Sequence, residues 1–165
     1  MYTTINDFAE EWDREFQLTE EVLNALTDAS LQQPVANERR TLGQIAWHLV
    51  MSVQYMTYCG LVFDGLAEDA PVPESAAVIA QNYRKIGRSF LNAVKAQWSD
   101  EQLLISQNVM GEEWKNGATL RFILMHQSHH RGQMTVLMRQ AGLRIPEVYG
   151  PTYDTWVDKG VAPLA

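Results

Sequence analysis

The sequence predicts an all-α fold, a four-helix bundle with a crossover connection and a packed C-terminal tail. Four long segments place apolar residues at steps of three and four, which is the period of a helix that buries one face. No segment of comparable length alternates as a strand would, and prolines and glycines separate the helical segments. The 165 residues suit a single domain, residues 1–165, that buries about two-thirds of the surface its unfolded chain exposes.

The first predicted helix covers about residues 4–28, with acidic side chains between its apolar positions. The apolar positions are Ile5, Phe8, Trp12, Phe16, Leu23 and Leu26. A break begins at Asp28, and Pro34 confirms it because proline removes a backbone donor and fixes φ.

The second predicted helix begins after Thr41, whose side chain is a good N-cap. Gln44 lies three residues later, so the two residues can form a capping box. The apolar pattern continues this helix through Thr57, and at most to Phe63. A loop with prolines and glycines follows, and its length leaves room for a crossover connection before the third helix, at about residues 74–98.

The segment 103–117 does not fit a helix. Apolar and polar residues alternate there between two glycines, and we expect a short irregular or extended excursion. The fourth long helix is expected over about residues 119–141. Gly142 at the left-handed stop position and Pro146 shortly beyond end it.

The C-terminal tail is rich in aromatic and apolar side chains. These are Val148, Tyr149, Tyr153, Trp156 and Val157. Because so much apolar surface is costly to leave in water, we expect the tail to pack back on the body.

The composition excludes several classes of function. With 20 acidic against 13 basic residues the formal net charge is −7, and we find no concentrated basic face, so no nucleic-acid partner is expected. The single cysteine, Cys59, cannot form an internal disulfide, and the N-terminus has neither a basic leader nor an apolar signal core, which favours a cytoplasmic location. No apolar run approaches the roughly 18 residues that span a bilayer, so no membrane partner is expected.

Three of the four histidines fall within five consecutive positions of the fourth predicted helix. The side chains of His126 and His130 lie four positions apart, so they point the same way and can share one ion. His48 lies in the apolar second helix, and we expect it to complete a site for one divalent metal ion. A lone histidine on an apolar face is usually a hydrogen-bonded core residue, which stays an alternative for His48 taken alone.

Other side chains near the predicted site have weaker roles. His129 falls at the edge of the histidine face, so it is the poorer ligand. We expect it to contact the metal ligands without binding the ion itself, or to line the pocket. Phe122, Gln133 and Leu137 share the face itself, which we expect the bundle to bury, and Gln133 can line the pocket. Trp47 precedes His48 and can border the pocket, although such an aromatic side chain is more often core.

Two other metal schemes do not fit the residues. Zinc proteases with the HEXXH motif carry a glutamate directly after the first histidine as general base, where this chain has Gln127. Ferritin-like di-iron bundles require glutamates three positions before the histidines, where this chain has Ile123 and Gln127. Arg131 points away from the site on the helical count, and we expect it to be solvated or at an interface.

Two segments resemble the DinB/YfiT-like superfamily of metalloenzymes: LGQIAWH at 42–48 and LMHQSHHRGQ at 124–133. The similarity covers nearly the whole chain. It implies a four-helix bundle with a site of three histidines, carried over onto His48, His126 and His130. This site would bind one divalent transition metal ion per chain, nickel or zinc, often in a homodimer.

The resemblance also implies a range of functions. Related members include thiol S-transferases that act with bacillithiol or mycothiol, and a maleylpyruvate isomerase. We therefore expect a metal-dependent enzyme for a small-molecule substrate, such as a low-molecular-weight-thiol S-transferase with a thiol cosubstrate. Some members have a glutamate where this chain has Gln127, and no other carboxylate base is evident, which favours thiol transfer over the first alternative, a metal-dependent hydrolase. The second alternative is a non-catalytic bundle that binds a metal or a small ligand.

Overall fold

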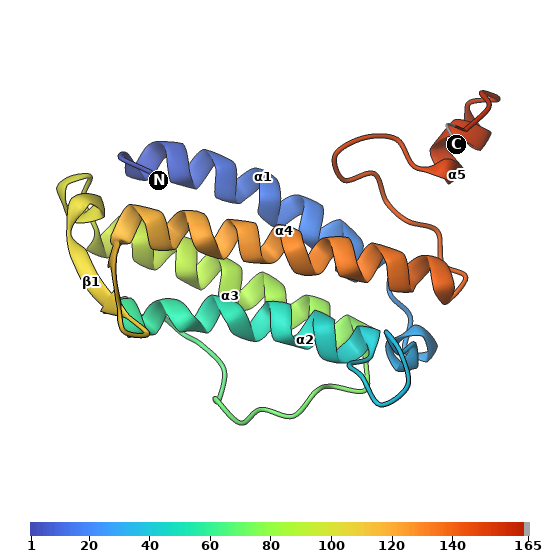
Figure 1. Cartoon of the computed structure of the whole chain (residues 1–165), viewed down its shortest axis with the longest axis horizontal. Helices are drawn as coiled ribbons and strands as arrows, with labels where there is room; N and C mark the ends of the chain where they lie inside the picture. The colour runs from blue at the N-terminus through green and yellow to red at the C-terminus, as the bar shows by residue number, and fades with distance from the viewer. Residues whose placement is uncertain (164–165) are drawn as a thin grey trace.

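The computed structural model describes residues 1–163 and is built on four long helices (Figure 1). These are α1 (Ile5–Asn24), α2 (Leu42–Ser52), α3 (Ala76–Gln97) and α4 (Asn116–Gln140). The shorter elements are the 3-10 helices η1 (Ala29–Gln32), η2 (Val53–Cys59) and η3 (Glu101–Leu104), strands β1 (Ser106–Val109) and β2 (Glu112–Lys115), and helix α5 (Tyr153–Asp158). The all-α prediction is confirmed. Within residues 1–163, no helix combines the length and the apolar composition needed to cross a bilayer.

The four long helices form a bundle in which α1 and α2 each pack against both α3 and α4. Helices α2 and α3 run in the same direction, so the chain that joins them, residues 60–75, passes along the length of the bundle (Figure 1). This is the predicted crossover connection. Helices α2 and α4 are antiparallel neighbours, and these two helices carry all four histidines.

Two of the predicted helix boundaries have the expected capping residues. Thr41 Oγ1 accepts a hydrogen bond from the backbone N–H of Gln44 (3.3 Å), and the Gln44 side chain accepts one from the N–H of Thr41 (2.9 Å), which confirms the capping box. Gly142, with φ of +77°, follows the end of α4 in the left-handed region. Helix α2 is shorter than predicted because the chain tightens into a 3-10 helix at Val53, which ends at Gly60.

Helix α1 also ends earlier than predicted, at Asn24. The following residues form a separate turn because Thr27 and Ser30 hydrogen-bond to each other's backbone. The Ser30 hydroxyl accepts from the Thr27 N–H (3.0 Å), and the Thr27 hydroxyl accepts from the Ser30 N–H (3.2 Å). Such short polar side chains give the backbone an alternative to the helix.

The core lies between the four helices, and aromatic side chains from α1 and α3 fill much of it. The ring of Trp12 meets that of Phe90 edge-on at 4.8 Å, and Phe16 stacks on Tyr83 at 4.9 Å. Gly87 is required for this close approach, since a Cβ there would lie 2.4 Å from a carbon of the Phe16 ring. The glycine inside the predicted third helix therefore serves packing.

The segment 103–117, predicted to be irregular or extended, forms part of η3 and a β-hairpin. Strands β1 and β2 are antiparallel, with Val109 opposite Glu112 at the turn. Met110 and Gly111 between them both have positive φ, 53° and 92°, as a two-residue type I′ turn requires.

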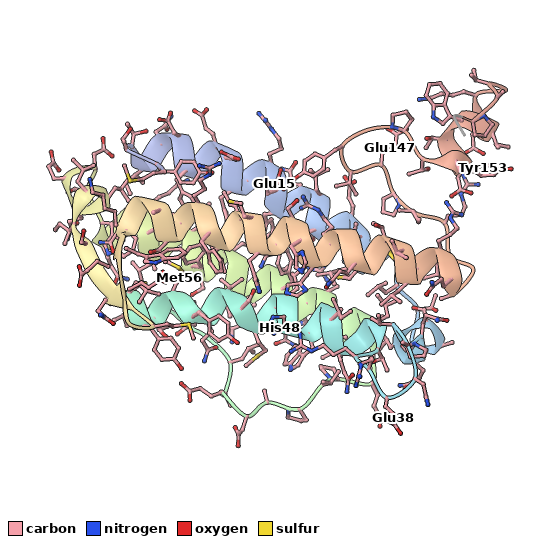
Figure 2. All side chains as sticks on the ribbon, in the orientation of Figure 1. Glu15, Glu38, His48, Met56, Glu147 and Tyr153 are labelled. Carbon is pink, nitrogen blue, oxygen red and sulfur yellow. The ribbon has the colours of Figure 1, made fainter. Side chains whose placement is uncertain are left out.

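The C-terminal tail packs on the bundle only in its first part, and the prediction for α5 is wrong. Leu143, Ile145 and Val148 contact the core, whereas no residue of α5 is buried and Tyr153 is 64% exposed (Figure 2). The last turn of α4 carries the charged side chain of Arg139. Arg139 pairs there with Asp154 of α5 at 2.6 Å, so α5 is held by surface ion pairs.

Candidate metal centre

The structure brings three histidines from two helices together. His48 comes from the middle of α2 (Figure 2), and His126 and His130 come from adjacent turns of α4. One ring nitrogen from each lies within 4.8 Å of the other two, and the Nε2 atoms of His126 and His130 are 3.1 Å apart. Nitrogens that bind one zinc ion at about 2.0–2.1 Å lie roughly 3 to 3.4 Å apart. The distance between His126 and His130 therefore suits a shared metal ion, and His48 lies close enough to be the third member of the group.

Gln127 holds the two histidine-bearing helices against each other. Its buried Nε2 donates to the carbonyl oxygen of Leu49 (3.1 Å) and lies 3.4 Å from the hydroxyl of Ser52. The N–H of Val53 bonds to Val50 rather than to Leu49, as the helix changes from α to 3-10, and the Leu49 carbonyl accepts instead from the Ser52 hydroxyl (2.7 Å) and from Gln127. The neutral amide after His126 thus fixes α4 next to the turn of α2 that follows His48.

Gln133 orients one of the histidines. Its Oε1 lies 2.8 Å from Nδ1 of His130. An amide oxygen only accepts, so Nδ1 carries the proton and Nε2 of His130 keeps its lone pair directed at His126. Gln133 and Phe122 are both exposed. The prediction that the bundle buries the whole histidine face of α4 is therefore wrong. His48 and His126 are half-buried and His130 is buried, so the three histidines lie at the edge of the bundle.

The other two predicted neighbours differ in position. His129 is exposed, and its ring lies 4.9 Å from that of His130 without joining the group of three. Trp47 is buried and its Nε1 donates to the carbonyl of Ala70 (3.0 Å), which ties the crossover connection to α2. Trp47 also lines the cleft beside His48.

Burial lowers the pKa of all three histidines and so favours their neutral form. Burial, followed by the neighbouring charge of His130 and of Arg40, lowers the pKa of His48 to about 4. Burial is also the main reason that the pKa of His126 falls to about 4 and that the pKa of His130 is lowered. A metal ligand must carry a free lone pair, so these rings are ready to bind at neutral pH.

Two buried polar atoms at the α2–α4 contact have no hydrogen-bond partner among the residues described. They are Nδ1 of His126 and Oε1 of Gln127. Because buried polar atoms are nearly always paired, such an atom calls for an explanation. The only hydrogen-bond contact of the His126 ring among the described residues is with Nε2 of His130, and an ion bound to both Nε2 atoms would replace this contact. Three imidazoles grouped in this way fit a divalent transition metal.

A cleft of about 550 Å³ opens beside His48. Its walls include Trp47, Met51 and Tyr55, and its charged residues are Arg40 and Glu68. This volume and this mixture of apolar walls with a few polar groups are typical of small-molecule sites.

Arg131 corrects the sequence prediction, which placed it in solvent or at an interface. It is 1% exposed, and its guanidinium donates to the carboxylate of Glu15 (2.5 Å), the hydroxyl of Thr19 (2.9 Å) and the hydroxyl of Tyr149 (2.6 Å). It points away from the histidines as predicted, but α1 covers it. The signal that could have revealed this is Glu15, which occupies an apolar position of the first helix between Trp12 and Phe16.

Comparisons with known proteins agree on one family. The family model described as the DinB family matches residues 1–161. A Bacillus subtilis (strain 168) protein described as "Uncharacterized protein YrdA" is 44% identical over 162 residues, which covers 98% of this chain and 97% of that protein.

Two solved structures are similar to the chain. A DinB-like protein from Bacillus cereus ATCC 10987 has a TM-score of 0.87 and 44% identity, over 90% of this chain and all of that one. The DinB-like protein YjoA from Bacillus subtilis has a TM-score of 0.65 and 14% identity, over 86% of this chain and 97% of that one, which speaks for the fold alone.

Proposed function

Because the chain belongs to the DinB family, we propose that His48, His126 and His130 bind one divalent transition metal ion, nickel or zinc, for catalysis. The observation that carries the proposal is the convergence of three neutral imidazoles beside an open cleft. Three protein ligands leave a position for an exogenous ligand, which distinguishes a catalytic site from a closed structural one.

We propose further that the reaction is S-transfer from a low-molecular-weight thiol to a small electrophile. A bound divalent ion would supply one chemical effect, a lower pKa of a coordinating thiol. In the transfer a sulfur–carbon bond forms. With an activated halide, the halide departs with its electron pair and the thiol proton goes to solvent, whereas with an unsaturated carbonyl compound the carbon–carbon π bond breaks and the adjacent carbon takes up a proton. Gln127, which follows the first ligand of α4, is neutral and is occupied in bonding α2, so it offers no general base.

A metal-dependent hydrolase is the second candidate, and one observation favours it. The carboxylate of Glu68 lines the same cleft as His48 and lies 3.4 Å from the Tyr58 hydroxyl, which can donate to it. A carboxylate in that place could take a proton from water, as a general base does.

An assay of metal-loaded protein separates these candidates. Activated aromatic halides and α,β-unsaturated carbonyl compounds are incubated with cysteine-derived thiols, and in parallel simple esters and amides are incubated without thiol. S-transfer predicts conjugation above the uncatalysed rate with wild type and with the control Gln140→Ala, and none above it with His126→Ala. Conjugation no faster than background in protein shown to carry metal would contradict S-transfer, and ester or amide turnover would then identify a hydrolase.

A further inference from the structure

The cleft beside His48 contains one cationic side chain that has no anionic partner among the described residues. Arg40 lines the cleft together with His48, and it forms no ion pair and no side-chain hydrogen bond with any of the described residues. Its neighbour Arg39 does not line the cleft, and its guanidinium bonds only to the carbonyl of Glu38 (3.5 Å). Two adjacent arginines therefore have different surroundings.

The backbone holds Arg40 at the edge of the cleft. Its carbonyl accepts from the N–H of Val35 (2.9 Å), and the next residue, Thr41, bridges to Pro34 and caps α2. Arg40 thus sits at the fixed end of a short arm rather than at a free loop tip. A guanidinium on a fixed backbone is a suitable anchor for a planar anion, since it can form two parallel hydrogen bonds.

The cleft does not share the acidic charge of the whole chain, because Arg40 balances its one acidic residue among those described. The chain has a net charge of −7, yet Glu68 is the only acidic residue that lines the cleft in the part of the chain described. Histidine binds a metal as the neutral imidazole, so a divalent ion held by three histidines would have no charge compensation from its ligands. Together with Arg40, such an ion would make this end of the cleft strongly attractive to anions.

The walls between the charged groups are apolar. Trp47, Met51 and Tyr55 line the cleft next to His48, and they can hold the hydrocarbon part of a bound molecule. A ligand suited to all of these features has a metal-binding atom, an apolar body and a carboxylate.

We propose that Arg40 binds the carboxylate of a small acid that occupies the metal centre, so that the site selects carboxylate-bearing thiols or substrates over neutral ones. The inference rests on the proposed metal-dependent function and adds the chemical class of its ligand. Arg40 is then a specificity-determining residue of the cleft rather than a surface charge.

A matched set of thiols tests this on full-length protein loaded with nickel or cobalt. The probes are ω-mercaptocarboxylates of increasing chain length and the primary amides of the same acids, and binding is followed by thiolate-to-metal charge-transfer absorption. At the best chain length the wild type should bind the carboxylate about tenfold or more tighter than the amide, since hydrogen bonds to a charged group are the stronger ones. Arg40→Gln should reduce this preference to less than about twofold, and Arg40→Lys should keep part of it.

The control Arg39→Gln should leave the preference unchanged, because Arg39 does not line the cleft. Metal content measured on every variant distinguishes a failure of the Arg40 proposal from a failure of the proposed metal-dependent function. Wild type that carries metal but shows no carboxylate preference, or a preference that survives Arg40→Gln, would overturn the role of Arg40 alone. Wild type that takes up no metal would overturn the metal-dependent function and this inference together.

Discussion

On the α1 side of α4, Arg131 makes four hydrogen bonds, and the Tyr149 hydroxyl closes the group by donating to Glu15 (2.6 Å). On the α2 side, Nε2 of His130, one residue earlier in the chain, lies 3.1 Å from Nε2 of His126. Nδ1 of His126 has no hydrogen-bond partner among the described residues. Both groups are polar and largely buried at helix contacts, but only the first is complete within the protein. The difference indicates that the Arg131 cluster is structural, whereas the histidine cluster has polar atoms available for a ligand from outside the chain.

Acidification should affect the histidine side most, up to complete loss of metal. Only a neutral imidazole binds a metal, so protons compete once the pH falls below the pKa of the ligand. Because the pKa values of His48 and His126 are lowered from 6.5 to about 4, metal should stay bound as the pH falls through 6.5 and should leave as it approaches 4. Metal analysis after dialysis at a series of pH values measures this. Release centred near pH 6.5 would mean that the rings behave as ordinary exposed histidines.

Replacement of the buried arginine should have the largest effect on stability. Arg131→Met removes one partner of a buried ion pair and leaves Glu15 without its cation, which costs about 3–5 kcal/mol in the free energy of unfolding. Urea titration of metal-free protein measures it. The control is Arg139→Met on the same helix, whose exposed pair with Asp154 should contribute less than about 1 kcal/mol. Equal losses for the two variants would show that the Arg131 cluster is not a structural centre.

Loss of the hydrogen bond between His130 and Gln133 should have a smaller effect. It should weaken metal affinity rather than folding. Gln133→Ala removes the acceptor of the Nδ1 proton of His130, and such a change typically weakens metal binding by about 10- to 100-fold. Gln140→Ala, at the exposed end of the same helix, is the control. Competition with a chelator of known affinity gives the ratio. An affinity within a factor of about two of wild type would show that the ring is oriented without Gln133.

The sequence was sufficient for features that depend on local spacing. The capping box of Thr41 and Gln44 follows from side chains three positions apart, and the paired direction of His126 and His130 follows from four. The crossover could be predicted from the length of the loop alone. Each of these features depends on residues within a single segment of the chain.

Features that depend on how two helices face each other could not be predicted in this way. Whether Arg131 lies in water or under α1 depends on the rotation of α4 relative to Glu15, which lies 116 positions away in the chain. The role of Gln127 depends on the change of α2 to a 3-10 helix, where the carbonyl of Leu49 accepts from Gln127 rather than from the N–H of Val53. The first part of the tail packs on the bundle as predicted, but the position of α5 was mispredicted because its aromatic content was visible and its ion pair with Arg139 of α4 was not.

Metal analysis of untagged protein purified without added chelator tests the metal centre most directly. A site of three converging, neutral histidines predicts about one equivalent of a divalent transition metal per chain in wild type and in His129→Ala, and its loss in His126→Ala and in His48→Ala. Less than about a tenth of an equivalent in wild type after incubation with nickel or zinc, or a metal content that none of these substitutions changes, would contradict the account.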